Sequence, residues 1–106
     1  MEFKNLGVVL VTTSSEEEAH EIASILIESK LAVCINFTPV TSVYQWEGEL
    51  KCDQEWQLII KTDLDNFSDL ATKIREIHSY EIPEIIALPI IKGSKSYLSW
   101  MQNNAK

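Results

Sequence analysis

Two long β-type segments that meet at one tight turn constrain the fold of this chain more than any other feature. Residues 31–46 read LAVCINFTPVTSVYQW, and residues 52–62 read CDQEWQLIIKT. Both segments are rich in β-branched and aromatic residues, which favour strands, and Glu47-Gly48-Glu49 forms the turn between them. They predict a hairpin whose strands far exceed the mean length of about 5–6 residues. Its long apolar edges need a partner, so we expect it to pair with other copies in a closed homo-oligomer.

The segment before the hairpin predicts a strand followed by a helix. Residues 6–13, LGVVLVTT, form a short β-branched run that is typical of a central buried strand. Residues 14–30 then begin a helix, because Ser15 and Glu18 have capping-box spacing and acidic residues fill the first turn. Its buried stripe is predicted to be Ala19, Ile22, Ala23, Leu26 and Ile27.

The segment after the hairpin repeats the plan of helix and strand. Residues 63–78 predict an amphipathic helix that Asp65 or Asn66 caps. Its buried stripe is predicted to be Phe67, Leu70, Ala71, Ile74 and Ile77. Residues 84–91, EIIALPII, then predict a fourth strand, and a short helix begins near Ser94 or Ser96.

The resulting order is β-α-β-β-α-β with an extra C-terminal helix. Two βαβ halves, roughly 5–46 and 53–92, make this an α+β, ferredoxin-like sandwich, and we expect residues 1–106 to form one domain. Proline removes a donor from the ladder and therefore belongs on edge strands. Pro39 and Pro89 fall in strands two and four, which are the two edges of a ferredoxin-like sheet.

Charge and cysteine content narrow the classes of function. The net charge of −7 and the absence of a Lys/Arg cluster argue against nucleic-acid binding. The apolar stretch at the N-terminus is too short for a secretory signal or a membrane span, so a cytoplasmic location and no membrane partner are expected. Cys34 and Cys52 do not form a CxxC pair, and they are expected to be free.

The residues that could carry chemistry gather around His78 in the stretch HSYEIPE. One interpretation is structural, because a histidine at the end of a helix complements the helix dipole. A second makes His78 a metal ligand with Glu81 or Glu84, and with Cys34 as a further candidate, since copper and other soft transition metals accept imidazole and thiolate. A third places Tyr80, Glu84 and Trp46 in a cleft between subunits, where their polar atoms find partners.

Several stretches together resemble the CutA1 family of divalent-cation tolerance proteins. They are LAVCINFTPVTSVYQWEGEL, the glutamate and the lysine-threonine of DQEWQLIIKT, HSYEIPEIIALPI and GSKSYLSWM. The resemblance covers nearly the whole chain with four motifs in order, and it implies a ferredoxin-like domain in a tight homotrimer similar to the PII signalling proteins. It also implies that clefts between subunits are the ligand sites, and that residues near such a cleft are Cys34, Trp46, Lys61, His78, Tyr80 and Glu84.

The resemblance further implies a link to divalent-metal tolerance and no enzymatic activity. No cofactor is required, and copper or another divalent cation is the candidate ion, with His78 as its predicted ligand. Some copper-binding members carry a cysteine where this chain has Val11 and a second histidine where it has Ile77. Only His78 of that set is present, and Ser79 replaces the usual proline of the motif.

The leading hypothesis is therefore a non-enzymatic homotrimer that responds to divalent metal ions. The alternative is a PII-like trimeric scaffold or sensor, whose clefts bind a small anionic metabolite or a partner protein and for which metal is incidental. An acylphosphatase-like enzyme on the same fold is disfavoured, because the first loop lacks an arginine to hold a phosphate.

Overall fold

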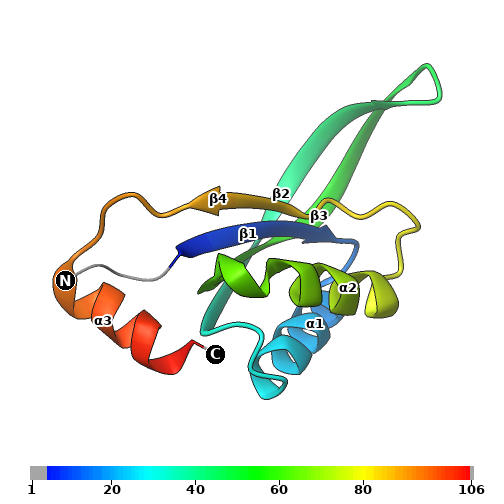
Figure 1. The fold of residues 1–106 in the computed structure, drawn as a ribbon. Helices are drawn as coiled ribbons and strands as arrows, with labels where there is room; N and C mark the ends of the chain where they lie inside the picture. The colour runs from blue at the N-terminus through cyan, green and yellow to red at the C-terminus, as the bar shows by residue number, and fades with distance from the viewer. Residues whose placement is uncertain (1–4, 106) are drawn as a thin grey trace.

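The computed structural model of the chain describes residues 5–105, and Figure 1 shows how its elements are arranged. The predicted order is confirmed, with one short 3₁₀ turn added before the second helix. The elements are β1 (Leu6–Thr13), α1 (Glu16–Glu28), β2 (Cys34–Trp46), β3 (Glu49–Asp63), η1 (Leu64–Asn66), α2 (Phe67–Ile77), β4 (Ile86–Pro89) and α3 (Lys95–Asn104).

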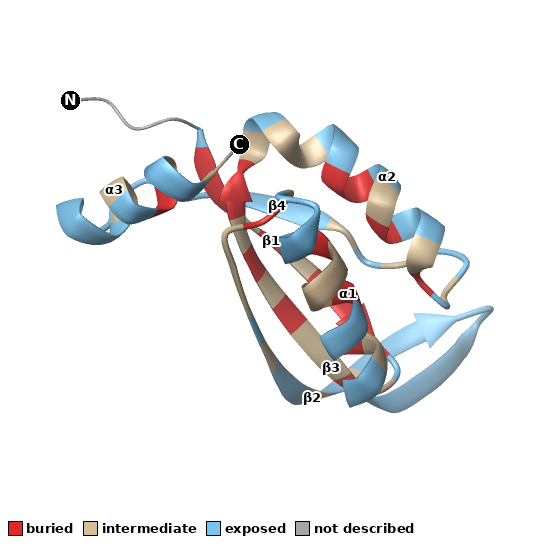
Figure 2. Ribbon diagram, turned by 90° about the horizontal axis from the view of Figure 1, so that it is seen from below, coloured by how far each residue is buried: buried red, intermediate tan, exposed pale blue. Residues whose placement is uncertain are grey.

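The four strands form one antiparallel sheet in the order β2-β3-β1-β4. Helices α1 and α2 lie side by side on one face of this sheet, as Figures 1 and 2 show from two directions. This is the ferredoxin-like arrangement. Pro39 lies in β2 and Pro89 in β4, so both prolines occupy edge strands as predicted.

The core fills the space between the sheet and these two helices. Alternate residues of neighbouring strands face the helices together: Val9 pairs with Ile60, and Val11 pairs with Leu58. All four side chains are fully buried, and Figure 2 shows the buried residues gathered between the two layers. The helices contribute Ala19, Ile22, Leu26, Leu70 and Ile74 to the same cluster.

The helix caps in the structure agree only in part with those predicted from the sequence. Ser15 caps α1, and its Oγ accepts a hydrogen bond from the Glu18 N–H at 3.1 Å. The cap of the second helix agrees with the prediction in part: Asn66 occupies the cap position of α2 but makes no side-chain capping hydrogen bond, and Asp63 caps the added turn η1. Ile27 was expected in the buried stripe of α1 but is 40% exposed, because it lies at the margin of the face that meets the sheet.

In the hairpin, β2 begins at Cys34 rather than at residue 31, whereas β3 is longer than the predicted 52–62. The outer part of the hairpin extends beyond the two helices (Figure 1). The turn is tighter than expected, because β3 already begins at Glu49. Glu47 and Gly48 both have positive φ, as a two-residue type I′ turn requires. Near the body, Leu58 and Ile60 belong to the core of this chain, so they need no second copy to cover them. The outer side chains Val43, Tyr44, Trp46 and Leu50 remain exposed.

The second face of the sheet is apolar as well, although α1 and α2 lie on the opposite side. Val8 pairs with Leu88 and Leu10 pairs with Ile86 across β1 and β4. Leu88 and Ile86 are 47% and 50% exposed. Because Ile59 of β3 lies opposite Leu10, this apolar face continues across the central strands of the sheet.

Helix α3 closes the chain at the end of the sheet where β1 begins (Figure 1). Ser94 caps it, since its Oγ accepts a hydrogen bond from the Tyr97 N–H at 3.3 Å. Met101 is fully buried, whereas Tyr97 and Trp100 remain partly exposed. None of the helices within residues 5–105 has the length and hydropathy to cross a membrane.

Candidate functional site

A cleft of about 420 Å³ lies where the hairpin leaves the body of the molecule. Three segments that are far apart in the sequence form its walls: the end of β1, the outer hairpin and the segment that follows α2. The residues that line it are Thr12, Tyr44, Trp46, Asp53, Glu55, Tyr80, Glu81, Ile82 and Glu84.

The strand period explains why aromatic and acidic side chains meet on the hairpin. Side chains two residues apart on a strand share one face of the sheet. Tyr44 and Trp46 therefore share a face of β2, and Asp53 and Glu55 share a face of β3. The register places Val40 opposite Glu55 and Ser42 opposite Asp53, so all four side chains belong to the same side of the hairpin.

Tyrosine hydroxyls donate to two of these carboxylates. The Tyr80 Oη donates to Glu55 Oε2 at 2.6 Å, and Tyr44 Oη donates to Asp53 Oδ2. Burial, together with this hydrogen bond and the charge of Glu55, raises the pKa of Tyr80 well above its ordinary value. The hydrogen bond to Asp53 is the main cause that raises the pKa of Tyr44. Both phenols therefore stay protonated and act as donors near neutral pH.

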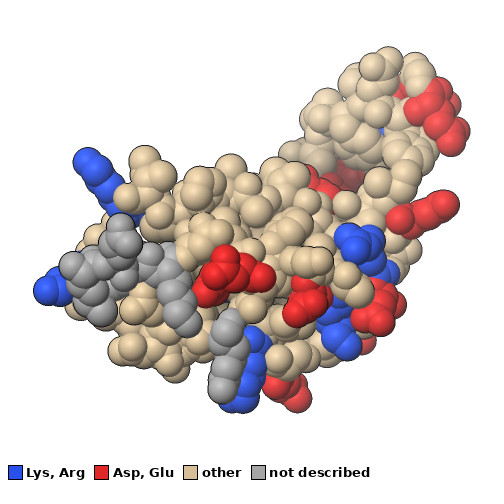
Figure 3. All heavy atoms as spheres, in the orientation of Figure 1, with Lys and Arg blue, Asp and Glu red and all other residues tan. Residues whose placement is uncertain are grey.

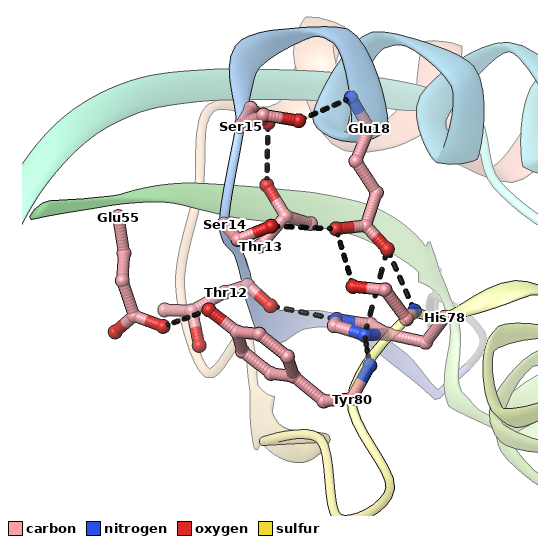
Figure 4. Close-up of polar contacts among 9 residues, drawn as sticks. Thr12, Thr13, Ser14, Ser15, Glu18, Glu55, His78 and Tyr80 are labelled. Carbon is pink, nitrogen blue, oxygen red and sulfur yellow. Dashed lines mark hydrogen bonds and ion pairs between the residues drawn. The ribbon is translucent and has the colours of Figure 1, made fainter. Parts of the chain in front are cut away.

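His78 lies directly behind Tyr80 and holds it in place (Figure 4). Its Nδ1 accepts a hydrogen bond from the Tyr80 N–H at 3.0 Å, and its Nε2 lies 2.7 Å from the carbonyl oxygen of Thr12. The first bond makes Nδ1 the acceptor, so Nε2 carries the proton and donates to Thr12. The ring is buried and its centroid lies 4.8 Å from that of Tyr80.

Glu18 anchors the same segment to the start of α1. Its carboxylate accepts the Ser79 N–H at 2.7 Å and the Ser79 hydroxyl at 2.9 Å, as Figure 4 shows. Burial opposes the charge of Glu18, but the two hydrogen bonds from Ser79 outweigh it and lower the pKa of Glu18. Glu18 thus contributes its N–H to the cap at Ser15 and its carboxylate to this loop. It fixes the loop that carries Tyr80.

The cleft is strongly acidic. Asp53, Glu55, Glu81 and Glu84 line it, and none of the described lining residues is Lys, Arg or His. Burial, together with the negative charge of Glu55, raises the pKa of Glu84. Figure 3 shows acidic side chains at the outer end of the hairpin and again where the hairpin approaches the body. The charge of the cleft therefore favours a cation over an anion.

The structure brings together some of the six residues singled out in the sequence. Trp46, Tyr80 and Glu84 line the cleft, and His78 supports it from behind. Cys34 and Lys61 do not reach this cleft within one chain. They face each other across β2 and β3 at the opposite end of the hairpin, where Lys61 Nζ lies 5.6 Å from the centre of the Tyr97 ring.

The sequence analysis did not propose Glu55, Asp53 or Glu18 as site residues, although Glu55 is the glutamate of DQEWQLIIKT and Glu18 was expected in a capping box. The alternation of Asp53 and Glu55 on one strand was visible, and it predicts that the two share a face. What was not visible is that Tyr80 and Tyr44 would lie next to them. The contact of Glu18 with Ser79 spans 61 positions, and no local pattern indicates it.

The geometry of a single chain does not favour a metal site. Among the residues that the structure describes, no three His, Cys, Asp or Glu side chains converge on one point. Both ring nitrogens of His78 already have backbone hydrogen-bond partners. An ion bound at His78 would have to displace one of them, so further ligands would have to come from the cleft carboxylates or from another copy.

Comparisons with known proteins agree with the fold. The sequence profile of the CutA1 divalent ion tolerance protein family matches residues 7–104. A "Divalent-cation tolerance protein CutA" from Thermus thermophilus is 46% identical over 98 residues, which cover 92% of this chain and 95% of that protein. The protein with the same description from Archaeoglobus fulgidus is 37% identical and covers 92% of this chain and 96% of its own.

Solved structures give the same result. The crystal structure of CutA1 from Oryza sativa superimposes with a TM-score of 0.94 at 39% identity, over 98% of this chain and 96% of that one. The Cut A1 structure from Thermus thermophilus gives a TM-score of 0.91 at 44% identity, over 95% and 99% of the two chains.

Proposed function

Because the chain belongs to the CutA1 family of divalent ion tolerance proteins, we propose that it serves divalent-metal tolerance as a homotrimer without enzymatic activity. The acidic cleft at the base of the hairpin is its ligand site. The observation that carries this proposal is the lining of that cleft, in which four carboxylates meet no basic side chain among the described residues.

Two apolar surfaces support assembly into a trimer. The second face of the sheet exposes Ile86 and Leu88, and the outer hairpin exposes Val43 and Leu50. Apolar surfaces of this kind on a small domain mark contacts with other proteins. A hairpin that extends past its own helices also presents strand edges that a neighbouring copy can pair with.

Assembly into a trimer would also explain why the six residues that the family resemblance implies do not all lie at one cleft of a single chain. Cys34 begins β2 and Trp46 ends it, so the two lie roughly 40 Å apart at about 3.3 Å per residue. If all six residues serve one cleft, Cys34 and Lys61 must reach it from a neighbouring subunit. We therefore propose that the ligand site lies between subunits, with Trp46, Tyr80 and Glu84 supplied by one copy.

In the leading version of this proposal the ligand is a divalent cation. Glu84 and Asp53 would contribute oxygen ligands, and a neighbouring subunit would complete the coordination. Copper binding through His78 stays a prediction, and so does a cytoplasmic location. The second candidate is a PII-like sensor of a small molecule, which the aromatic wall of the cleft favours. The acidic lining argues against the anionic metabolite that the sequence analysis considered.

Calorimetric titration of the intact, metal-free oligomer with Cu²⁺ and Zn²⁺ tests the leading version. We expect saturable binding that Glu84→Gln weakens roughly tenfold or more, because a ligand or its immediate support is lost. His78→Gln keeps a donor and an acceptor near the original positions. A loss of Cu²⁺ binding in this variant would therefore indicate direct ligation by His78.

Two results would contradict the metal site. One is binding no stronger than that of scattered surface carboxylates, and the other is full affinity in Glu84→Gln. Light scattering of the same samples must show an intact oligomer for each variant, because the proposed site takes ligands from a neighbouring subunit.

A further inference from the structure

We infer that the cleft binds a small organic cation of the alkylammonium class, held between its aromatic side chains and the carboxylate of Glu55. This inference rests on the proposed role of the cleft as a ligand site, and it specifies the chemical class of the ligand. Four observations carry it: a buried acidic group without a counter-ion, an aromatic wall, the volume of the cleft and the state of its carboxylates.

Glu55 is the first observation. It is only 8% exposed, and it forms no ion pair with any residue in the described range 5–105. The hydrogen bond found for its side chain comes from Tyr80, a neutral donor. Buried acidic groups in proteins are normally paired with a cation, because removing an unpaired charge from water is costly. Within the described part of one chain Glu55 has no such partner. A cation bound in the cleft would supply it, and so would the Lys61 ammonium of a neighbouring subunit where it reaches the cleft.

The aromatic wall is the second observation. Tyr44, Trp46 and Tyr80 all line the cleft together with Ile82. Trp46 and Tyr44 are 48% and 40% exposed, so much of their surface is open to a ligand. Aromatic faces attract cations through the ring quadrupole, and side chains of this kind form the cages that bind alkylated ammonium groups.

The volume of the cleft also suits a small molecule. About 420 Å³ falls within the range of roughly 300–1,000 Å³ that is usual for small-molecule sites, which are mostly apolar with a few polar groups. A bare metal ion would leave most of this space empty.

The hydrogen bonds that the cleft carboxylates already accept favour an organic cation over a metal ion as the ligand. Phenol hydroxyls already donate to Glu55 and Asp53, so one oxygen of each is engaged. These groups still contribute negative charge, but they offer fewer free oxygens to a hard cation. An alkylammonium ion needs no ordered set of oxygen ligands, because charge and apolar contact hold it.

The test is a calorimetric titration of the intact oligomer with tetramethylammonium chloride, with tert-butanol as a neutral compound of similar size. We expect tetramethylammonium to bind at least tenfold more tightly than tert-butanol. Trp46→Leu and Glu55→Gln should each weaken binding at least fivefold. Trp100→Leu makes the same change outside the cleft and should leave the affinity within twofold of the unmodified protein.

Glu84→Gln provides a second variant, because Glu84 is more exposed than Glu55 and its substitution spares the Tyr80 contact. It should weaken tetramethylammonium binding at least twofold. Equal affinities for the cation and tert-butanol, or full affinity in both Trp46→Leu and Glu84→Gln, would overturn the inference.

The outcomes also separate this inference from the metal proposal. Zn²⁺ binding that depends on Glu84, without tetramethylammonium binding, would overturn the organic cation and leave the metal site. Tetramethylammonium binding without Zn²⁺ binding would support the organic cation and contradict the metal site. If both bind and compete, one cleft serves both, and the inference stands.

Discussion

At the scale of single residues, Glu18 and His78 hold the loop that carries Tyr80, so that the Tyr80 side chain faces the cleft. Glu18 holds the backbone of Ser79, and His78 bonds the next backbone N–H while its ring packs on Tyr80. The family motif that HSYEIPE resembles has a proline where this chain has Ser79. A proline restricts the backbone covalently, whereas Ser79 is held by two hydrogen bonds to a carboxylate from α1.

This difference predicts a pH-dependent stability that Glu18→Gln removes. The pKa of Glu18 in the folded protein lies below its ordinary value of 4.5, so the folded state favours the ionised form. The stabilisation is complete above about pH 4.5 and is lost as the pH falls through the lower, folded value. Glu18→Gln should cost about 1 kcal/mol at pH 7, and the deficit should shrink on acidification.

Urea denaturation at fixed protein concentration, repeated between about pH 7 and pH 3, measures this effect. Glu17→Gln is the matched control, because it removes an exposed acidic side chain from the same helical turn. A deficit for Glu18→Gln that stays constant across this range would show that the charge of Glu18 is not what matters.

Sequence patterns could predict only part of the site at this scale. Tyr80, Glu84 and Trp46 were predicted to share a cleft between subunits, where a carboxylate would partner the Tyr and Trp polar atoms. In the structure they line one cleft within a single chain. Glu55 could not be predicted, because its role depends on the segment after α2 folding back against β3. Periodicity indicates which face a side chain occupies, but not which distant segment lies opposite that face.

At the scale of elements, β1 and β4 approach each other closely at Gly7. An added Cβ there would lie 2.6 Å from the carbonyl oxygen of Leu88 and 2.6 Å from Leu64 Cδ1. The carbonyl belongs to a paired strand and cannot move alone. Glycine at this position therefore allows the Leu64 side chain of η1 and the backbone of β4 to approach β1 closely.

We therefore predict that Gly7→Ala destabilises the protein by about 1–3 kcal/mol, as overpacking of a filled site does. Gly93→Ala is the control, since its Cβ would meet only the flexible end of Leu98 at 2.9 Å. Chemical denaturation of both variants measures the difference. Equal loss of stability in the two variants would mean that the carbonyl of β4 does not set the cost.

The order of elements was predictable, because hydrophobic periodicity and the two prolines agree with one topology. The residues at which helices and strands begin and end were less predictable. The sequence did not predict the 3₁₀ turn η1, which Asp63 caps, and Asn66 then occupies the cap position of α2. The predicted fourth strand shrinks to four residues, since only the part that pairs with β1 stays regular.

At the scale of the whole molecule, the sheet has one covered face and one that is still apolar and open. Val8, Leu10 and Ile59 are only partly buried on this second face, while Ile86 and Leu88 beside them are about half exposed. A trimer that packs these faces together would bury them all, and the free energy gained would scale with the apolar area removed from water.

Leu88→Lys tests this arrangement, because it introduces a charge on the open face without touching the core between sheet and helices. We expect the variant to run as a smaller species, with the mass of one chain rather than three, in chromatography with light scattering. Its thermal midpoint should fall and should lose the dependence on protein concentration that an oligomer shows. Thr72→Lys places the same charge on an exposed position of α2 and should stay trimeric. A trimer that persists in Leu88→Lys would place the interface elsewhere, and the outer hairpin with Val43 and Leu50 would then be the surface that assembles the protein.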